Sequence, residues 1–226
     1  MRKTFLILVA FAGTSFTTQS AEAEGKYVSA FAGVSWMPQM HVNNTNTSYD
    51  YMDHYSMKPN AALSGAIGYD YGSCRLEGEL GSLRNNFKSL VMTGTDENGA
   101  PFSDASYACK GNVSIVSFMA NGYYDFNPGG NVKLYTTVGV GCARVSFNNV
   151  GRASENYGNN INTMSLASQI GAGVTTPITE NISIDIRYRY FMTSNMTVNW
   201  DYKGKDYNNN TSIKSHSISV GTRISL

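Results

Sequence analysis

The sequence predicts an all-β fold: an eight-stranded antiparallel up-and-down β-barrel that spans a membrane. Eight segments alternate apolar and polar residues with a period of two, as half-exposed strands do. The connections between them alternate between short and long. Charged residues share one side of the segments with many glycines. A closed transmembrane barrel accounts for all three observations.

The composition favours strands over helices. The chain has 226 residues, including 22 Gly, 15 Tyr and 10 Phe, and strong helix formers are scarce after the first two dozen positions. Only 15% of the residues are charged, and the formal net charge is +1. A nucleic-acid-binding protein needs a basic face, so the composition argues against a nucleic acid as partner.

Residues 1–23 have the features of a secretory signal peptide. Two basic residues precede an apolar core at residues 5–11, and Ala21-Glu22-Ala23 offers the small-x-small pattern that signal peptidase cuts. The apolar core is well short of the roughly 20 residues that a transmembrane helix needs. We therefore expect an exported protein whose mature part, residues 24–226, forms one barrel domain.

Each of the eight segments has an apolar side that is predicted to face lipid. The segments cover residues 27–37, 61–69, 74–87, 113–126, 132–147, 166–176, 182–193 and 216–226. The predicted lipid-facing residues include Val34, Leu76, Phe118, Val138, Val140, Ile170, Ile184, Ile186, Ile218, Val220 and Ile224. Aromatic residues near the segment ends predict the interfacial girdle of such a barrel: Trp36, Tyr69, Tyr124, Phe126, Tyr188 and Tyr190.

The connections predict which way the barrel points. Three are short, at residues 70–73, 127–131 and 177–181. Four are long and polar, at residues 38–60, 88–111, 148–163 and 194–215. This alternation places three short periplasmic turns and both termini at one end, and four long extracellular loops at the other. Closing the sheet also satisfies the backbone polar groups that lipid cannot.

The charged sides of the segments predict the content of the barrel lumen. In a soluble sandwich this side would face water, but its many glycines favour a narrow interior where small residues relieve crowding and opposite charges pair. The predicted ion-pair network contains Arg75, Glu77, Glu79, Lys133, Asp185, Arg187, Arg189 and Arg223. Two roles remain open for it: a plug that fixes the register of the strands, or a charge gate in a narrow porin-like channel.

Three cysteines cannot all pair with one another. In the predicted hairpin, Cys142 faces a residue near Ile115, about six positions from Cys109. That separation is too long for a disulfide, whose Cα atoms lie within about 7 Å. We therefore expect three free thiols.

The long loops are the candidate recognition surface. They are rich in Asn (Asn43, Asn44, Asn46, Asn208, Asn209 and Asn210) and in Tyr (Tyr49, Tyr51, Tyr55, Tyr157, Tyr202 and Tyr207). Tyr supplies a large contact area at low entropic cost and Asn supplies adaptable hydrogen bonds, a mixture suited to binding proteins or glycans. The alternative is a hydrophilic surface that binds no partner, which would have the same polarity.

No catalytic site, cofactor or metal site is expected. His41 and His54 lie near Asp50 and Asp53 in the first long loop, which could bind a cation, but the spacing matches no known metal-binding loop. No Ser, His and acid are spaced so as to assemble a catalytic triad. A lipid-modifying outer-membrane enzyme is therefore the weakest alternative.

Six stretches of this sequence, taken in order, resemble eight-stranded outer-membrane barrels related to opacity proteins and the OmpA-like transmembrane domain. They are YVSAFAGVSW, RLEGELGSLR, SFMANGYYDF, VGVG at 138–141, SQIGAGV and ISIDIRYRYF. The resemblance implies a surface protein of adhesin or antigen type in a Gram-negative outer membrane. It also implies three kinds of partner: outer-membrane lipid with lipopolysaccharide, the barrel-assembly machinery, and a host or cell-surface ligand bound by the long loops. The chain departs from the family in ending on Leu226 instead of an aromatic residue.

Overall fold

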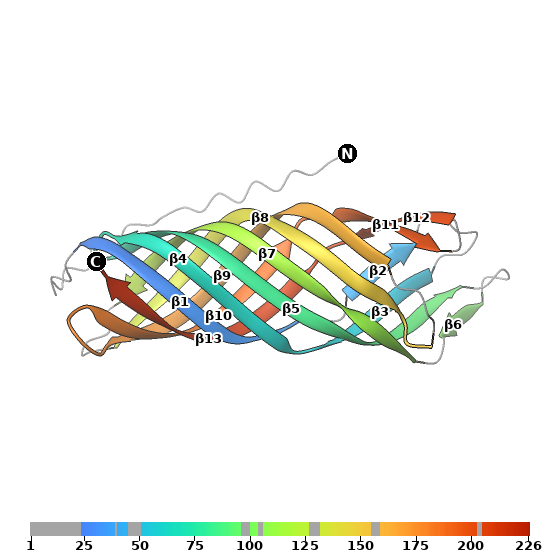
Figure 1. Ribbon diagram of the computed structural model, residues 1–226, viewed down its shortest axis with the longest axis horizontal. Coiled ribbons are helices and arrows are strands. Elements are labelled where there is room, and N and C mark those ends of the chain that lie inside the picture. Colours follow the sequence, from blue (N-terminus) through green and yellow to red (C-terminus); the bar gives the residue numbers. More distant parts are fainter. Residues whose placement is uncertain are drawn as a thin grey trace.

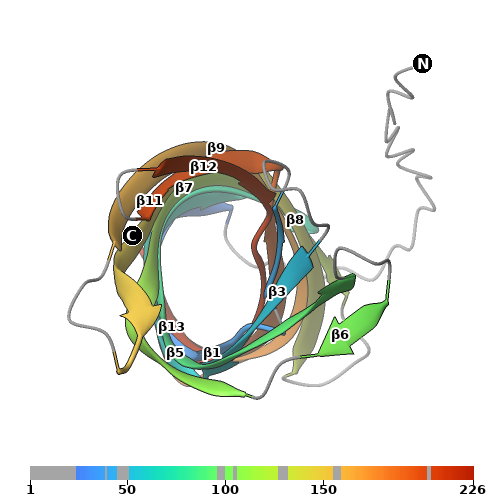
Figure 2. The same ribbon diagram turned by 90° about the vertical axis from the view of Figure 1, so that its right-hand side faces the viewer.

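Eight strands of the computed structural model form a closed antiparallel ring, which confirms the predicted fold (Figure 2). The structure describes residues 24–38, 40–44, 51–95, 100–103, 106–126, 132–154, 159–202 and 205–226. The ring consists of β1 (Gly25–Trp36), β4 (Asn60–Asp70), β5 (Cys74–Thr95), β7 (Tyr107–Phe126), β8 (Lys133–Arg152), β9 (Asn159–Pro177), β10 (Ile182–Thr193) and β13 (Lys214–Ser225). The last strand pairs with the first from Tyr27 opposite Ser225 to Trp36 opposite His216, and so closes the ring.

The two ends of the barrel differ. We call the end that holds the start of β1 and the end of β13 the turn end, and the opposite end the loop end (Figure 1). At the turn end, Gly72 turns the chain between β4 and β5 with a φ of 88°, and its N–H donates to Asp70 Oδ1 at 2.8 Å. A positive φ favours glycine at this position. Among the described residues, no helix is long and apolar enough to cross a membrane.

The predicted long loops contain further strands at the loop end. These are β2 (Met40–Asn44), β3 (Tyr51–Lys58), β6 (Pro101–Ser103), β11 (Met196–Tyr202) and β12 (Lys205–Thr211). In addition, β5 has 22 residues and both β7 and β8 have 20, whereas a strand needs only about 9–11 residues to cross a membrane. The barrel wall therefore continues well beyond the bilayer, where the sequence predicted irregular loops.

The outward and inward faces of the strands exchange polarity at the point where the strands leave the membrane. On β8, Val140 faces outward with 67% exposure, and the outward positions turn polar from Arg144 on. The inward positions change in the opposite sense, from Thr137 to the fully buried Val145 and Phe147. A wall in lipid needs apolar residues outside, and a wall in water needs them inside. The polarity of these extensions made them resemble loops in the sequence.

The inward apolar residues near the loop end pack into one cluster, which we call the apolar layer. It contains Met37, Phe87, Val113, Ile115, Met119, Ala143, Val145, Phe147, Val150, Ala167, Phe191, Met196, Val198 and Ile213. Six strands contribute to it (β5, β7, β8, β9, β10 and β11), together with Met37 just after β1 and Ile213 just before β13. The loop end is therefore held together by a hydrophobic core like that of a soluble protein.

Aromatic side chains mark two levels on the outer face. Towards the loop end, His216 stacks on Trp36 with ring centroids 5.5 Å apart, and Tyr188 and Tyr190 also contact it. At the turn end, Tyr69 and Tyr124 each lie within 5 Å of a second aromatic ring, measured between centroids. Membrane barrels carry aromatic girdles at both interfaces, so the two levels delimit the part of the wall that lies in lipid.

The predicted register of the β7–β8 hairpin was wrong. Cys142 faces Phe118, three residues from the predicted Ile115, and Cys109 faces Arg152. The register of a hairpin follows from the length of its turn, and periodicity alone locates strand ends only approximately. All three cysteines are free thiols in the structure.

Glycines on the inward side make room for aromatic residues on the neighbouring strands. Tyr135 lies opposite Gly173 and Tyr27 lies opposite Gly68. A Cβ added at either glycine would come within 2.4 Å of the facing tyrosine ring. These close approaches explain why glycines share the charged side.

Gly173→Ala should destabilise the barrel by about 1–3 kcal/mol because the added methyl group must displace Tyr135. Gly122→Ala is the matched control, since a Cβ there would meet nothing within 4 Å. Urea unfolding of both variants in phospholipid vesicles measures the difference. Equal stability of the two variants would contradict this packing.

Candidate functional site

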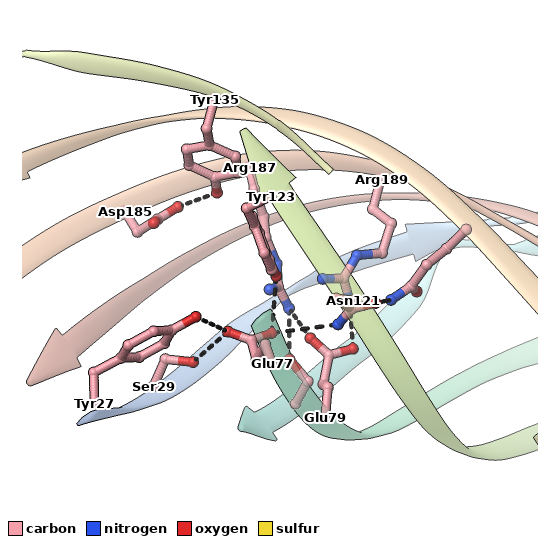
Figure 3. Close-up of polar contacts among 12 residues, drawn as sticks. Tyr27, Ser29, Glu77, Glu79, Asn121, Tyr123, Tyr135, Asp185, Arg187 and Arg189 are labelled. Atoms are coloured by element: carbon pink, nitrogen blue, oxygen red, sulfur yellow. Dashed lines mark hydrogen bonds and ion pairs between the residues drawn. The ribbon is translucent and has the colours of Figure 1, made fainter. Parts of the chain in front are cut away.

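The turn-end half of the lumen holds a layer of buried charges, which we call the charged layer (Figure 3). Seven of the eight residues predicted for the lumen are at most 7% exposed: Arg75, Glu77, Glu79, Asp185, Arg187, Arg189 and Arg223. Lys133 is half-buried and is the first residue of β8, at the turn end. Their strands place them inside because every second residue of a strand points to the same side.

Glu79 lies at the centre of this layer. Its carboxylate is 2.5 Å from Arg189 Nη1 through Oε1 and 3.1 Å from Arg187 Nη2 through Oε2. Arg187 also donates to Ser64 Oγ at 2.6 Å and lies over the Phe31 ring, with its Cζ 3.5 Å from the ring centroid. Glu79 is 1% exposed. The Glu79 carboxylate therefore ties β5 to β10 on the opposite side of the ring, and Arg187 extends the link to β4.

Glu77 is held in a different way, by neutral donors. Tyr123 Oη donates to Glu77 Oε1 at 2.8 Å, and Tyr27 Oη donates to Oε2 at 3.2 Å. Ser29 and Asn121 add longer hydrogen bonds of 3.4 and 3.3 Å. A buried carboxylate needs several donors to offset its lost hydration, and four side chains from two strands, β1 and β7, supply them here.

Arg75 pairs with Asp125 towards the turn end. Its Nε and Nη2 donate to the two carboxylate oxygens of Asp125 at 2.7 and 2.8 Å, a bidentate geometry. The guanidinium also lies over the rings of Tyr123 and Tyr135, 4.4 and 5.0 Å from their centroids. Tyr135 in turn donates a short hydrogen bond to Asp185.

Several residues of the charged layer were missing from the predicted network. They are Asp70, Asp125, Tyr27, Tyr123 and Tyr135. Asp70 lies 3.8 Å from Arg223, and Asp125 neutralises Arg75. All five share the polar side of their strands, so their alternation in the sequence was the signal that could have identified them.

In the described part of the chain, buried side chains occupy the lumen at both levels. Between the charged layer and the apolar layer lies a cavity of about 30 Å³, lined by Glu79, Arg187, Arg189 and Phe191 among others. This volume has room for only one or two water molecules. Above it the apolar layer presents buried Val and Phe side chains. A hydrated ion would have to shed its water to enter such a layer, which is costly.

The structure brings together part of the predicted recognition surface. Asn43 and Asn44 of β2 pair with Asn210 and Asn209 of β12, so the first and last long connections join in one sheet. Tyr51, Tyr202 and Tyr207 lie on β3, β11 and β12. Tyr55 is half-buried, with its ring 5.4 Å from that of Phe87, and so it packs on the apolar layer. Tyr49, Tyr157, Asn46 and residues 1–23 lie outside the described residues.

The histidines do not assemble a catalytic or metal site in the described part of the chain. His54 lies 2.8 Å from Thr93 Oγ1, and His216 Nδ1 lies 2.6 Å from Tyr188 Oη. Among the described residues, no three His, Cys, Asp or Glu side chains gather as ligands for a metal ion. Asp50 lies outside this part of the chain, and His41 lies on β2.

A closed ring with an apolar outer face, a polar interior and long strands at one end defines the class of outer-membrane β-barrels. The chain belongs to the family described as the outer membrane protein beta-barrel domain, whose sequence model matches residues 5–223. It is therefore a protein of the bacterial outer membrane, with the turn end periplasmic and the loop end extracellular.

Three known proteins are similar to this chain. The outer membrane protein PagN of Salmonella typhimurium is 25% identical over 219 residues, which cover 91% of this chain and 90% of PagN. A candidate adhesin of Rickettsia conorii is 25% identical over 185 residues, or 76% of this chain and 70% of the relative. The crystal structure of Neisserial surface protein A shares the fold with a TM-score of 0.50, at 19% identity, over 89% of this chain and 97% of that one.

Glu79→Gln should destabilise the barrel by about 3–5 kcal/mol, because it leaves Arg187 and Arg189 without their shared carboxylate. The control is Glu180→Gln, at an exposed position in the turn between β9 and β10. The midpoint of urea unfolding in vesicles gives the measurement. If Glu79→Gln unfolded at the same urea concentration as Glu180→Gln, the ion pairs would have no structural role.

In planar lipid bilayers the protein should give no steady ionic current, because the apolar layer closes the lumen above the charged layer. Recording at neutral pH with a general porin as positive control tests this expectation. A steady conductance that changes on Glu79→Ala would instead identify a charge gate.

Proposed function

We propose that this protein is a surface-recognition protein of adhesin type, which the barrel anchors and the extracellular extension presents to a partner. One observation carries the proposal: strands of 19 to 22 residues continue beyond the membrane, with polar residues outside and an apolar core inside. Such an extension is a folded platform, and a barrel that served only to span the membrane would have no need of it.

The composition and the placement of the platform support a binding role. Strands β2 and β12 bring Asn residues of two distant connections side by side. Tyr207 lies on β12 itself, and the neighbouring strands β3 and β11 carry Tyr51 and Tyr202. Tyr and Asn are well suited to protein and glycan surfaces. One relative, matched over 70% of its length, is described as a candidate adhesin. The proposed partner is therefore a protein or glycan on a host or neighbouring cell.

The proposal assigns no catalytic activity to the chain, and it gives the charged layer a structural role. It also includes a route to the membrane. Residues 1–23 would direct export and be removed before Glu24, and the barrel-assembly machinery would insert the rest among outer-membrane lipids.

Bacteria that produce this protein should adhere to cultured epithelial cells, and Tyr202→Ala with Tyr207→Ala should reduce adherence by about tenfold if these tyrosines are binding hot spots. Tyr71→Ala is the control, because Tyr71 is 52% exposed at the periplasmic end. A heat-shift gel verifies that each variant is folded. Adherence no higher than that of the empty vector, or unchanged in the folded double variant, would contradict the proposal.

A further inference from the structure

The wall of the extracellular extension is open at one place, whereas the ring below it is closed. Four ring strands, β9, β8, β7 and β5, continue into the extension, and β3, β2, β12 and β11 follow them in that order. In the described part of the chain, no ladder joins β11 back to β9, although the two strands lie side by side (Figure 2). We call the gap between residues 159–165 of β9 and Met196–Tyr202 of β11 the seam.

The seam begins where the ladder between β9 and β10 stops. The last pair is Ala167 opposite Thr193, and the Ser194 N–H then donates to the Leu166 carbonyl oxygen at 2.9 Å. Alternate residues of a strand direct their N–H and C=O groups to the same edge, so residues 162 and 164 direct theirs towards the seam. Over its described length, β11 pairs with β12 only. Two strand edges therefore face each other with backbone groups that no ladder uses.

The packing of β9 is incomplete along the seam. Val145 and Phe147 of β8 are at most 1% exposed. The residues of β9 that face them, Thr163 and Ile161, are only half-buried. On the outer face Met164 is 71% exposed, at a level where the outward residues of β8 have become polar. The seam thus offers a half-buried apolar position inside and an exposed one outside.

The hairpin on the other side of the seam is attached to the extension at few points. β11 and β12 pair with each other along their whole length, but β12 pairs with β2 at only two described positions. The hairpin can therefore move outward as a unit when two pairs break. Val198 of β11 is 1% exposed and belongs to the apolar layer, so whatever enters the opened seam must cover it with an apolar side chain.

We propose that the seam binds an extended segment of a partner polypeptide, which inserts between β9 and β11 and pairs with both. The inference deepens the proposed recognition function and rests on it, because it names the partner as a protein and gives the partner a place on the extension. A β-strand carries backbone N–H and C=O groups along both edges, and a glycan or lipid chain does not. A second copy of this chain offers β9 and β11 with one free edge each, so it could complete only one side of the seam.

The side chains along the seam indicate the pattern of the bound segment. Ile161 and Val198 point inward, and Met164 and Thr197 point outward. Successive residues of a strand point to opposite faces. The inserted segment should therefore alternate apolar residues, which join the apolar layer, with residues that lie on the outer face.

The test measures the width of the seam in the full mature barrel in detergent micelles. Spin labels are attached at residues 164 and 197 in a chain whose Cys74, Cys109 and Cys142 are replaced by Ser. The probe is a soluble peptide in which Thr and Val alternate between terminal lysines. An inserted strand separates its neighbours by one further strand spacing, so the distance between the labels should increase by about 5 Å in pulsed electron spin resonance. Labels at residues 144 and 164, which face each other across the β8–β9 ladder, are the matched control and should keep their distance.

A pair of variants tests whether the backbone edge carries the binding. Asn162→Pro removes an N–H group directed at the seam, and a free strand edge tolerates proline, so this variant should fold and bind the peptide about tenfold more weakly. Asn162→Ala keeps the N–H group and should bind within a few-fold of wild type. Peptides with N-methyl groups along either edge should also lose binding, and they keep the test valid if Asn162→Pro does not fold.

Three results would overturn the proposal. An unchanged label distance at millimolar peptide would show that the seam stays closed. A distance increase that survives N-methylation of both edges would show that backbone pairing has no part in it. A short distance between two singly labelled barrels would show that a second copy occupies the seam. No cell enters these measurements, and the adherence assay needs no insertion, so failure of one is distinct from failure of the other.

Discussion

The change of medium along the barrel wall determines the whole arrangement of side chains. Where hydrocarbon surrounds the ring, apolar residues such as Ile184 and Val220 face outward and the polar groups must pair inside. Where water surrounds it, the same strands turn their polar residues outward and bury Val145 and Phe147. Both halves obey one rule, and the boundary between them locates the membrane surface.

The two layers of the lumen stabilise the barrel by different means. The charged layer holds carboxylates of β5 and β10 with arginines and tyrosines of other strands. These contacts fix the strand register, because a slip would leave buried charges unpaired. The apolar layer holds the extension by burial alone. Together their side chains occupy the lumen in the described part of the chain, so the outer face and the extracellular end are the surfaces available to partners.

Alternation in the sequence was sufficient to predict the ring and the side on which Glu79 or Arg187 lies, since the period of a strand is set by geometry. The lengths of the connections predicted its orientation. It could not predict the extensions. Beyond residue 147, where the predicted strand ended, β8 continues through Asn148 and Asn149, which are as polar as the residues of a loop. The carboxylates that pair with Arg75 and Arg223 lie on other strands. Which strands lie close together in the ring cannot be deduced from any single segment.

The most direct test places single cysteine spin labels at outward positions of β8, residues 138, 140, 144 and 146, in a chain whose Cys74, Cys109 and Cys142 are replaced by Ser. Relaxation by oxygen and by a water-soluble nickel chelate then reports lipid or water at each position. The account predicts oxygen-dominated relaxation at 138 and 140 and nickel-dominated relaxation at 144 and 146. Nickel-dominated relaxation at all four positions would contradict it.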